Sequence, residues 1–294
     1  MATGPQKYPG ASLSAWYQDD YGGDLMEVNV VVLHTTEGTT LPDYQGGAVA
    51  PNLTAVPDFA NKRLRWFQHF DIDRSSRALR NLSGGVETNT LNVVQVELVG
   101  TCDPATHAKW TKAGYAHIYW PEAPDWALRG VADFLAWTHT NHGIPLTGPA
   151  LWLPYPQSGA AGSKARMTFT QWENFNGICG HQHVPENDHG DPGNIEFPRL
   201  IAYAKGDTPT TPEEPAMALS DADVERIATA VWQKMAKADG VYLAPTDAAD
   251  YSPDVNHPGH YWSGRTLFAD LIRRVRDTQK TVAELAAAQK TKGS

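Results

Sequence analysis

The chain has 294 residues, 41% of them hydrophobic, which is enough for one sizeable core or for a large and a small domain. Charged residues make up 19% of the sequence, so the composition is that of a folded protein and not of a disordered chain. The formal net charge of −9 argues against nucleic acid as the main partner.

The first ten residues, MATGPQKYPG, contain no basic stretch followed by an apolar one, so no secretory signal peptide is expected. No apolar run approaches the roughly 18 residues that a membrane helix needs, so no membrane insertion is expected. Two cysteines, Cys102 and Cys179, are too few for a disulfide framework. The sequence leaves open whether they are bonded to each other.

Three apolar segments predict strands of a buried sheet. VNVVVLH (28–34) and LNVVQVELVG (91–100) are rich in β-branched residues and almost continuously apolar, as is typical of strands covered on both faces. RLRWFQHFDI (63–72) alternates well enough to predict a third strand. The first of these strands ends at His34, next to the polar turn TTEGTT.

Helical patterns follow the strands. The apolar stripe of residues 125–142 predicts a helix, with Asp125 as its expected cap and Gly143 beyond its end. Residues 146–180 are glycine-rich and are expected to form a loop, and 197–205 predicts a short closing helix. Strands alternating with helices indicate an α/β layer structure.

The proline-rich segment 206–216 contains almost no apolar residue and predicts a linker between a first domain, 1–205, and a helical C-terminal region, 217–294. In the latter, 219–235 has one apolar helical face, and 266–285 has a short heptad seam. The seam fits a homo-oligomer interface as well as packing within one chain, and the region carries equal numbers of acidic and basic residues.

The segment GHQHVPENDHGDPG (180–193) concentrates groups that bind metals or transfer protons. Together with His34 at a strand end, His181 and Asp191 make a two-histidine, one-carboxylate set, which is typical of catalytic zinc with one position left for water. In an extended segment His181 and His183 would point to the same side, so the residues alone leave His183 or His189 open as the third ligand.

Glu97 lies in the middle of the apolar strand at 91–100, where a carboxylate is costly unless it has a partner or a function. One interpretation is an outward-facing residue on the same face as Gln95. The other is a general base beside a metal-activated water.

Three segments, VVLHTTEG, LNVVQVELVG and GHQHVPENDHGDPG, occur in the order found in a known family. They resemble the zinc-dependent N-acetylmuramoyl-L-alanine amidases of type 2, which share their fold with the peptidoglycan recognition proteins. The resemblance covers roughly residues 10–205 and implies a central mixed β-sheet flanked by helices. The segment HQHVPENDHGDPG further resembles the corresponding segment in endolysins of phages that infect actinobacteria.

The resemblance also implies roles for individual residues. His34, His181 and Asp191 match the three zinc ligands, the last a place held by cysteine in some relatives. Glu97 matches the carboxylate that activates water, and His189 falls where relatives place a donor beside the carbonyl oxygen. The family often carries a serine–histidine pair where PNLTAV stands here, and no role is implied for His183.

The implied reaction is hydrolysis of the amide between N-acetylmuramic acid and L-alanine in peptidoglycan, with one Zn²⁺ ion. A phage enzyme of this kind is made in the host bacterial cytoplasm without a signal peptide and acts on the cell wall after release. Two other interpretations are a peptidoglycan-binding module without activity and a cysteine hydrolase that uses Cys179. For residues 217–294, a wall-binding module, an oligomerisation helix pair and a passive tail all fit.

Overall fold

The computed structural model describes residues 4–89 and 92–207 and, beyond them, only residues 242–243, 261–262, 273–274 and 280. The chain divides into two compact units, residues 1–209 and 210–294. No helix among the described residues is long and apolar enough to cross a membrane.

In the second unit the short strands β6 (Tyr242–Leu243) and β7 (Tyr261–Trp262) pair antiparallel, which the sequence patterns did not predict. Residues 273, 274 and 280 are helical, within the span of the predicted heptad seam. The predicted helix at 219–235 and the rest of the seam lie outside the described residues.

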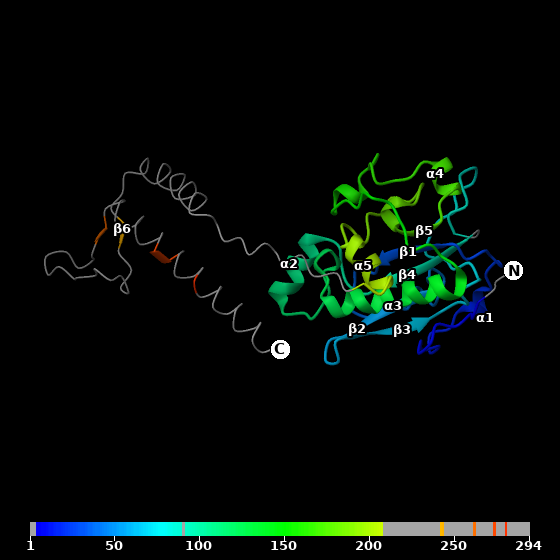
Figure 1. Ribbon diagram of the computed structural model, residues 1–294, viewed down its shortest axis with the longest axis horizontal. Coiled ribbons are helices and arrows are strands. Elements are labelled where there is room, and N and C mark those ends of the chain that lie inside the picture. Colours follow the sequence, from blue (N-terminus) through cyan, green and yellow to red (C-terminus); the bar gives the residue numbers. More distant parts are fainter. Residues whose placement is uncertain are drawn as a thin grey trace. The chain divides into compact units, whose positions relative to one another are not determined.

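The first unit is built on a five-stranded mixed sheet with strand order β3-β2-β4-β1-β5 (Figure 1). Strand β3 is antiparallel to β2, and the other neighbouring pairs are parallel. The strands are β1 (Val30–Thr35), β2 (Leu53–Asp58), β3 (Arg63–Gln68), β4 (Val93–Leu98) and β5 (Gly177–Gly180). The predicted α/β class with a central mixed sheet flanked by helices is confirmed.

Burial explains the composition of the strands. Every residue of β1 is buried, because β1 lies between β4 and β5 and both of its faces are covered. Val31 and Leu33 belong to the main core on one face, whereas Val30 and Val32 belong to a smaller core on the other. At the edge of the sheet, β3 alternates exposed arginines with buried apolar residues, since only one face is covered there.

The main core is covered by α3 (Asp125–His142), whose buried stripe packs against β3 and α5 (Phe197–Ala204). The other helices are α1 (Gln18–Tyr21), α2 (Pro104–Ala113) and α4 (Phe169–Glu173), the last of which contributes Trp172 to the smaller core. Strongly periodic segments therefore form the elements that their patterns predict, including α3 over its full predicted length.

Two expectations about elements were wrong, and two elements were not predicted. Pro124, not Asp125, occupies the cap position of α3, and Asp125 instead accepts a hydrogen bond from Arg129 Nε at 2.7 Å. The glycine-rich segment 146–180 contains α4 and β5, which are too short for a periodic pattern. Strand β2 and helix α2 were also missed. Helix α2 has readable signals, because Asp103 caps it, a proline begins it and Gly114 ends it in the left-handed region.

Candidate metal centre

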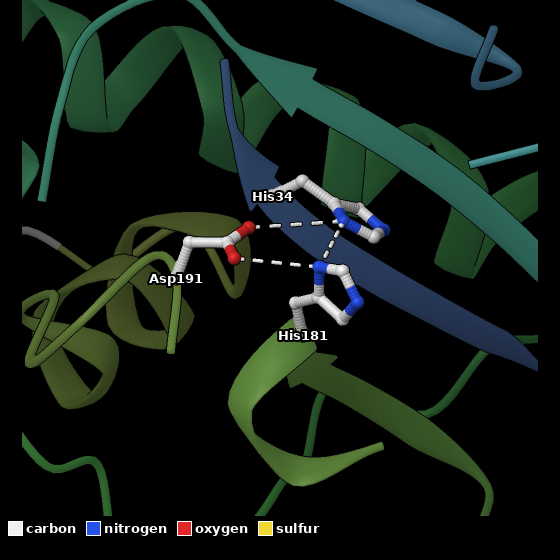
Figure 2. Close-up of side chains that lie close together, drawn as sticks. All are labelled: His34, His181 and Asp191. Carbon is white, nitrogen blue, oxygen red and sulfur yellow. Dashed lines mark hydrogen bonds and ion pairs between the residues drawn. The ribbon is translucent and has the colours of Figure 1, made fainter. Parts of the chain in front are cut away.

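His34 and His181 come together because two parallel strands end at the same edge of the sheet. His34 is the penultimate residue of β1, and Leu33 is paired with Gly180, the last residue of β5, so His181 follows directly beside His34. Their Nδ1 atoms lie 3.0 Å apart and their ring centroids 4.5 Å apart (Figure 2). Both side chains are buried.

Asp191 is brought to this edge by a turn that folds the segment after β5 back on itself. Gln182 holds the turn, because its backbone N–H donates to the Asp191 carbonyl at 3.0 Å and its Nε2 donates to the Gly193 carbonyl at 2.6 Å. The Asp191 carboxylate lies 3.3 Å from His181 Nδ1 and 3.7 Å from His34 Nδ1. It also accepts the Thr35 backbone N–H at 3.0 Å, which orients it.

These three residues fit a metal ion. They are the one group of three or more such side chains in the described part of the chain whose ligand atoms converge within 4.8 Å, and all three are buried. The separations of 3.0, 3.3 and 3.7 Å bracket the ~3.3 Å edge expected of a tetrahedron with zinc–ligand bonds of about 2.0–2.1 Å. His34, His181 and Asp191 could therefore bind a metal ion together.

The protonation states also suit a cation. Burial, reinforced by the neighbouring His181, lowers the pKa of His34 well below its usual value, so its imidazole stays neutral and able to ligate. Burial alone would raise the pKa of Asp191, but His181, His189 and His34 together hold it well below the usual range. His34 and Asp191 thus present unprotonated ligand atoms at neutral pH.

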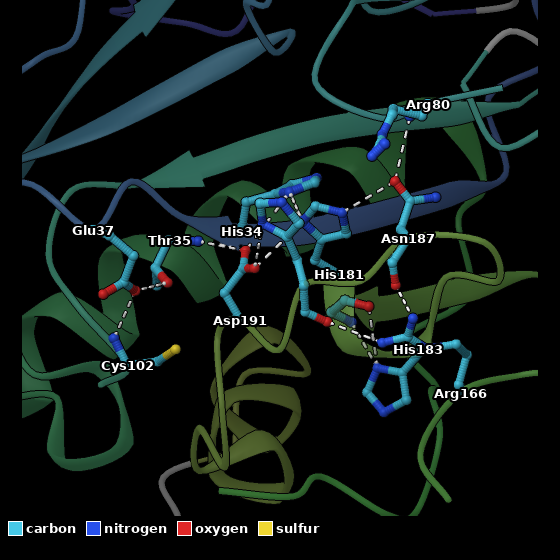
Figure 3. Close-up of polar contacts among 12 residues, drawn as sticks. His34, Thr35, Glu37, Arg80, Cys102, Arg166, His181, His183, Asn187 and Asp191 are labelled. Carbon is cyan, nitrogen blue, oxygen red and sulfur yellow. Dashed lines mark hydrogen bonds and ion pairs between the residues drawn. The ribbon is translucent and has the colours of Figure 1, made fainter. Parts of the chain in front are cut away.

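Asn187 orients the His181 ring by contacting the ring nitrogen that does not face His34 and Asp191 (Figure 3). Its Oδ1 lies 3.3 Å from His181 Nε2, and because an amide oxygen only accepts, Nε2 carries the hydrogen and Nδ1 is left free for an ion. Asn187 is itself held by its Nδ2, which donates to the Pro185 carbonyl at 2.9 Å, and by the Arg80 backbone N–H, 3.3 Å from Oδ1. Sequence reasoning missed this residue, since no spacing rule marks it.

Replacing Asn187 by alanine is expected to weaken metal binding about 10–100-fold, because His181 loses the partner that sets its tautomer and ring orientation. Competition with a chromophoric chelator measures the effect. Asn174→Ala is the matched control, since that exposed amide donates to the Thr170 carbonyl of its own helix region and forms no hydrogen bond to the centre within the described part of the chain. Equal affinity in the Asn187→Ala and Asn174→Ala chains would refute the assigned role.

His183 is not a ligand. Residues His181–His183 form a 3₁₀ turn, not an extended segment, so the two histidines do not share a side. His183 Nδ1 accepts the Gly180 backbone N–H at 3.0 Å, and Nε2 donates to the Leu151 carbonyl at 2.9 Å. Burial lowers the pKa of His183 to about 4, so it is a neutral structural residue that links two backbone segments.

Glu97 is the register partner of His34 on the neighbouring strand β4. Its Oε2 is buried, with no hydrogen-bond partner among the described residues. Burial raises the pKa of Glu97 well above its usual value, and the nearby Asp191 and Glu37 carboxylates add to the rise. Glu97 is half-buried, with one carboxyl oxygen enclosed, and it stands beside His34 in surroundings that favour its protonated form.

This burial predicts a pH-dependent stability. With its raised pKa, Glu97 keeps its proton in the folded chain above pH 4.5, the usual value at which the unfolded chain releases it. The metal-free wild type should therefore lose unfolding free energy as the pH rises through the folded-state pKa, whereas Glu97→Gln should not. We expect the variant to exceed the wild type in free energy of unfolding by about 0.5–2 kcal/mol. This difference, seen as a higher Tm, should be larger at pH 8 than at pH 5. Calorimetric scans measure it, and an equal gain at both pH values would contradict the assignment.

His189 lies at the open side of the centre. Its side chain is 69% exposed, its ring stacks on His181 at 4.5 Å, and its Nδ1 is 3.6 Å from Asp191 Oδ1. The neighbouring Asp191 carboxylate raises the pKa of His189 despite partial burial, which favours the charged donor form. Arg166 supports this loop, because its guanidinium donates to the backbone carbonyl of Asn187 (Figure 3). It also donates to the backbone carbonyl of His189.

The centre opens onto a cavity of about 390 Å³. Its lining combines the loop that carries Asp191 with the segments after β1 and β4 and the start of α2, and comprises Glu37, Cys102, Asp103, Thr106, Tyr155, Asp188, His189, Gly190 and Asp191. A substrate in this cavity would lie against the carboxylate ligand and His189.

The cysteines do not form a nucleophilic site. Cys102 and Cys179 are both free and buried. Burial raises the pKa of the Cys179 thiol, so the thiolate that a cysteine hydrolase needs does not form at neutral pH. The interpretation as a cysteine hydrolase is therefore wrong.

No model of a known protein family and no curated protein matches the chain. Among solved structures, the chain is similar to a mutant structure of PlyL, with a TM-score of 0.35 and 11% identity over 65% of this chain and 96% of that one. It is also similar to the Staphylococcus aureus hydrolase AmiA in complex with its ligand, with a TM-score of 0.34 and 14% identity over 68% of this chain and 94% of that one. Similarity at this level identifies no family, and the chemistry follows from the residues of the centre.

Proposed function

We propose that the chain is a zinc-dependent hydrolase that cleaves the amide between N-acetylmuramic acid and L-alanine in bacterial peptidoglycan. The observation that carries the proposal is the convergence of His34, His181 and Asp191 at one sheet edge, with Glu97 on the adjacent strand. The resemblance of three ordered segments to type 2 amidases supplies the substrate class.

Zinc is the metal that best suits two imidazoles and one carboxylate in a compact buried site. Held by His34, His181 and Asp191, it would act as a Lewis acid that activates water and polarises the substrate carbonyl. The cavity beside Asp191 provides room for the scissile amide.

Glu97 is proposed to move the proton. It stands beside His34 on the adjacent strand, and a bound cation would favour its carboxylate form, whose raised basicity lets it accept a proton from the attacking water. The same carboxylic acid then passes that proton to the nitrogen of the leaving L-alanine. The bond that forms joins the water oxygen to the lactyl carbonyl carbon, and the bond that breaks is the C–N bond.

His189 is proposed to stabilise the oxygen of that carbonyl. It faces the cavity, and its contact with Asp191 favours the protonated imidazole, which donates a charge-assisted hydrogen bond. Arg166 holds the backbone on which His189 stands. Glu97 then acts on the amide nitrogen by delivering the proton, and His189 acts on the charge that develops on the carbonyl oxygen.

A peptidoglycan-binding module without activity remains the alternative function. Loss of a metal ligand would favour it, and all three ligand types are present and close together here. Substrate cleavage separates the two interpretations directly.

We propose further that the enzyme is a phage endolysin, made in the host bacterial cytoplasm and acting on the wall after release. The similarity of HQHVPENDHGDPG to endolysins of actinobacteriophages supports this role. The region 217–294 would then bind the wall or join chains into oligomers.

Mass spectrometry of digested cell wall tests the proposed bond. The expected products are glycan strands with a free lactyl carboxyl group and stem peptides that begin with L-alanine. New reducing sugar ends, or new amino termini within the stem peptide, would assign a different bond. Dipicolinate should abolish the cleavage and added zinc should restore it, and unchanged cleavage in the chelator would exclude the metal mechanism.

A further inference from the structure

A second pair of imidazoles lies outside the centre described above. His107 stands on α2, and His117 lies in the segment that follows this helix. His107 Nδ1 and His117 Nε2 are 2.9 Å apart, and both side chains are half-buried. The proposed amidase reaction uses neither residue.

The hydrogen bonds fix the tautomer of His117. Its Nδ1 lies 2.7 Å from the Tyr115 carbonyl, and because a carbonyl only accepts, Nδ1 carries the hydrogen. In the neutral ring, Nε2 is then an unprotonated nitrogen whose lone pair faces His107. A histidine that donates one ring N–H to a backbone carbonyl and presents the other nitrogen is the usual arrangement of a metal ligand.

The pair matches the candidate metal centre in geometry. There, the two facing nitrogens are 3.0 Å apart with rings inclined at 63°, and here they are 2.9 Å apart with rings inclined at 58°. In each pair one ring is oriented from behind by an oxygen acceptor, Asn187 Oδ1 for His181 and the Tyr115 carbonyl for His117. Among the described residues, no carboxylate completes a set of three at the second pair.

Aromatic neighbours hold both rings in place. His107 stacks on Tyr119 with centroids 4.5 Å apart at 18°, and Trp110 meets His117 edge-on at 5.2 Å. Rings held in this way lose little freedom when they bind an ion, so less binding free energy is spent on ordering them.

We propose that His107 and His117 form a second metal site, for a divalent transition-metal ion that favours imidazole. With metal–nitrogen bonds of about 2.0–2.1 Å, nitrogens 2.9 Å apart subtend an angle of roughly 90°, which suits the tetragonal geometry of Cu²⁺ or Ni²⁺. On binding, the His107 proton moves from Nδ1 to Nε2, so both nitrogens donate lone pairs and both rings stay neutral. Water fills the remaining positions.

The site adjoins the substrate cavity. Thr106, the residue before His107 on α2, and Asp103, the cap of that helix, both line the cavity. An ion on the His107–His117 pair would place positive charge within about one helical turn of this acidic lining. The site itself stands whether or not the chain is an amidase, because no catalytic residue takes part in it.

Calorimetric titration of Ni²⁺ into the zinc-loaded full chain tests the proposal. We expect a Ni²⁺ equivalent that His107→Gln and His117→Gln each weaken on the order of 100-fold, because a single imidazole loses the advantage of two linked ligands. His142→Gln is the matched control, since His142 is half-buried and bonds a backbone carbonyl but faces no second imidazole in the described part of the chain. The proposed site would be overturned if the wild type did not bind this Ni²⁺ equivalent, or if both variants bound it as tightly as the wild type.

Paramagnetic resonance of Cu²⁺ on the unmutated chain gives a result that does not depend on variants folding. With zinc in the first centre, the spectrum of the added Cu²⁺ should show superhyperfine splitting from two imidazole nitrogens. A spectrum with one nitrogen or none would overturn the pair as ligands. His181→Ala should keep this signal, which separates the second site from the first and from the fate of the amidase proposal.

Discussion

Replacing Asp191 by alanine should remove the bound metal and the peptidoglycan-cleaving activity together. The change deletes one of three ligands and leaves two, too few for tight binding in a site whose fourth position is kept for water. The metal content after dialysis, measured by mass spectrometry, should fall to near background. The rate of wall cleavage, measured on the same sample, should fall to near background as well. The same loss is expected for His34→Ala and His181→Ala.

Two further variants separate ligation from folding. Asp188→Ala is the matched control for metal retention, because this nearby carboxylate is 91% exposed and 3.8 Å from Arg166. Asp191→Cys supplies a thiolate, which also ligates zinc, and should recover metal even though it cannot accept the Thr35 N–H as the carboxylate does. Stoichiometric zinc in the Asp191→Ala chain would show that the ligand assignment is wrong and that His189, the remaining imidazole beside the centre, takes its place.

Replacing Glu97 by glutamine should lower turnover by about 10²–10⁴, the usual contribution of general acid–base catalysis, while the metal stays bound. Glutamine keeps the shape of the side chain on β4 but can no longer take the proton from the attacking water. Because Glu97 is not among the three converging ligands, zinc content and binding of peptidoglycan fragments should match those of the wild type.

The pH profile adds a readout that a structural role would not move. The rising limb of the wild-type profile should belong to Glu97 and the attacking water as a coupled pair, and Glu97→Gln should lose or displace it. Glu122→Gln serves as the control, since this carboxylate is exposed and lies outside the centre. Turnover close to wild type in the Glu97→Gln chain would remove Glu97 from the mechanism, and the proton would have to pass through His189.

The elements that the sequence predicts well are those with long, uniform burial patterns. β1, β4 and α3 each bury a face or both faces against the main cores, so their apolar residues recur at the period of the element. β5 is only four residues long and half glycine, and its place beside β1 depends on pairing with a strand almost 150 positions earlier. Local pattern carries no information about such a pairing.

The candidate site divides in the same way. The sequence by itself determined that histidines and carboxylates gather in 180–193 and that His34 and Glu97 sit on buried strands, because residue type and strand pattern are local properties. Only the tertiary structure decided between the histidines. The 3₁₀ turn directs His183 to the Leu151 carbonyl, and the turn before Gly193 places Asp191 against the Thr35 N–H. These choices depend on hydrogen-bond partners far away in the chain, which spacing along the sequence does not specify.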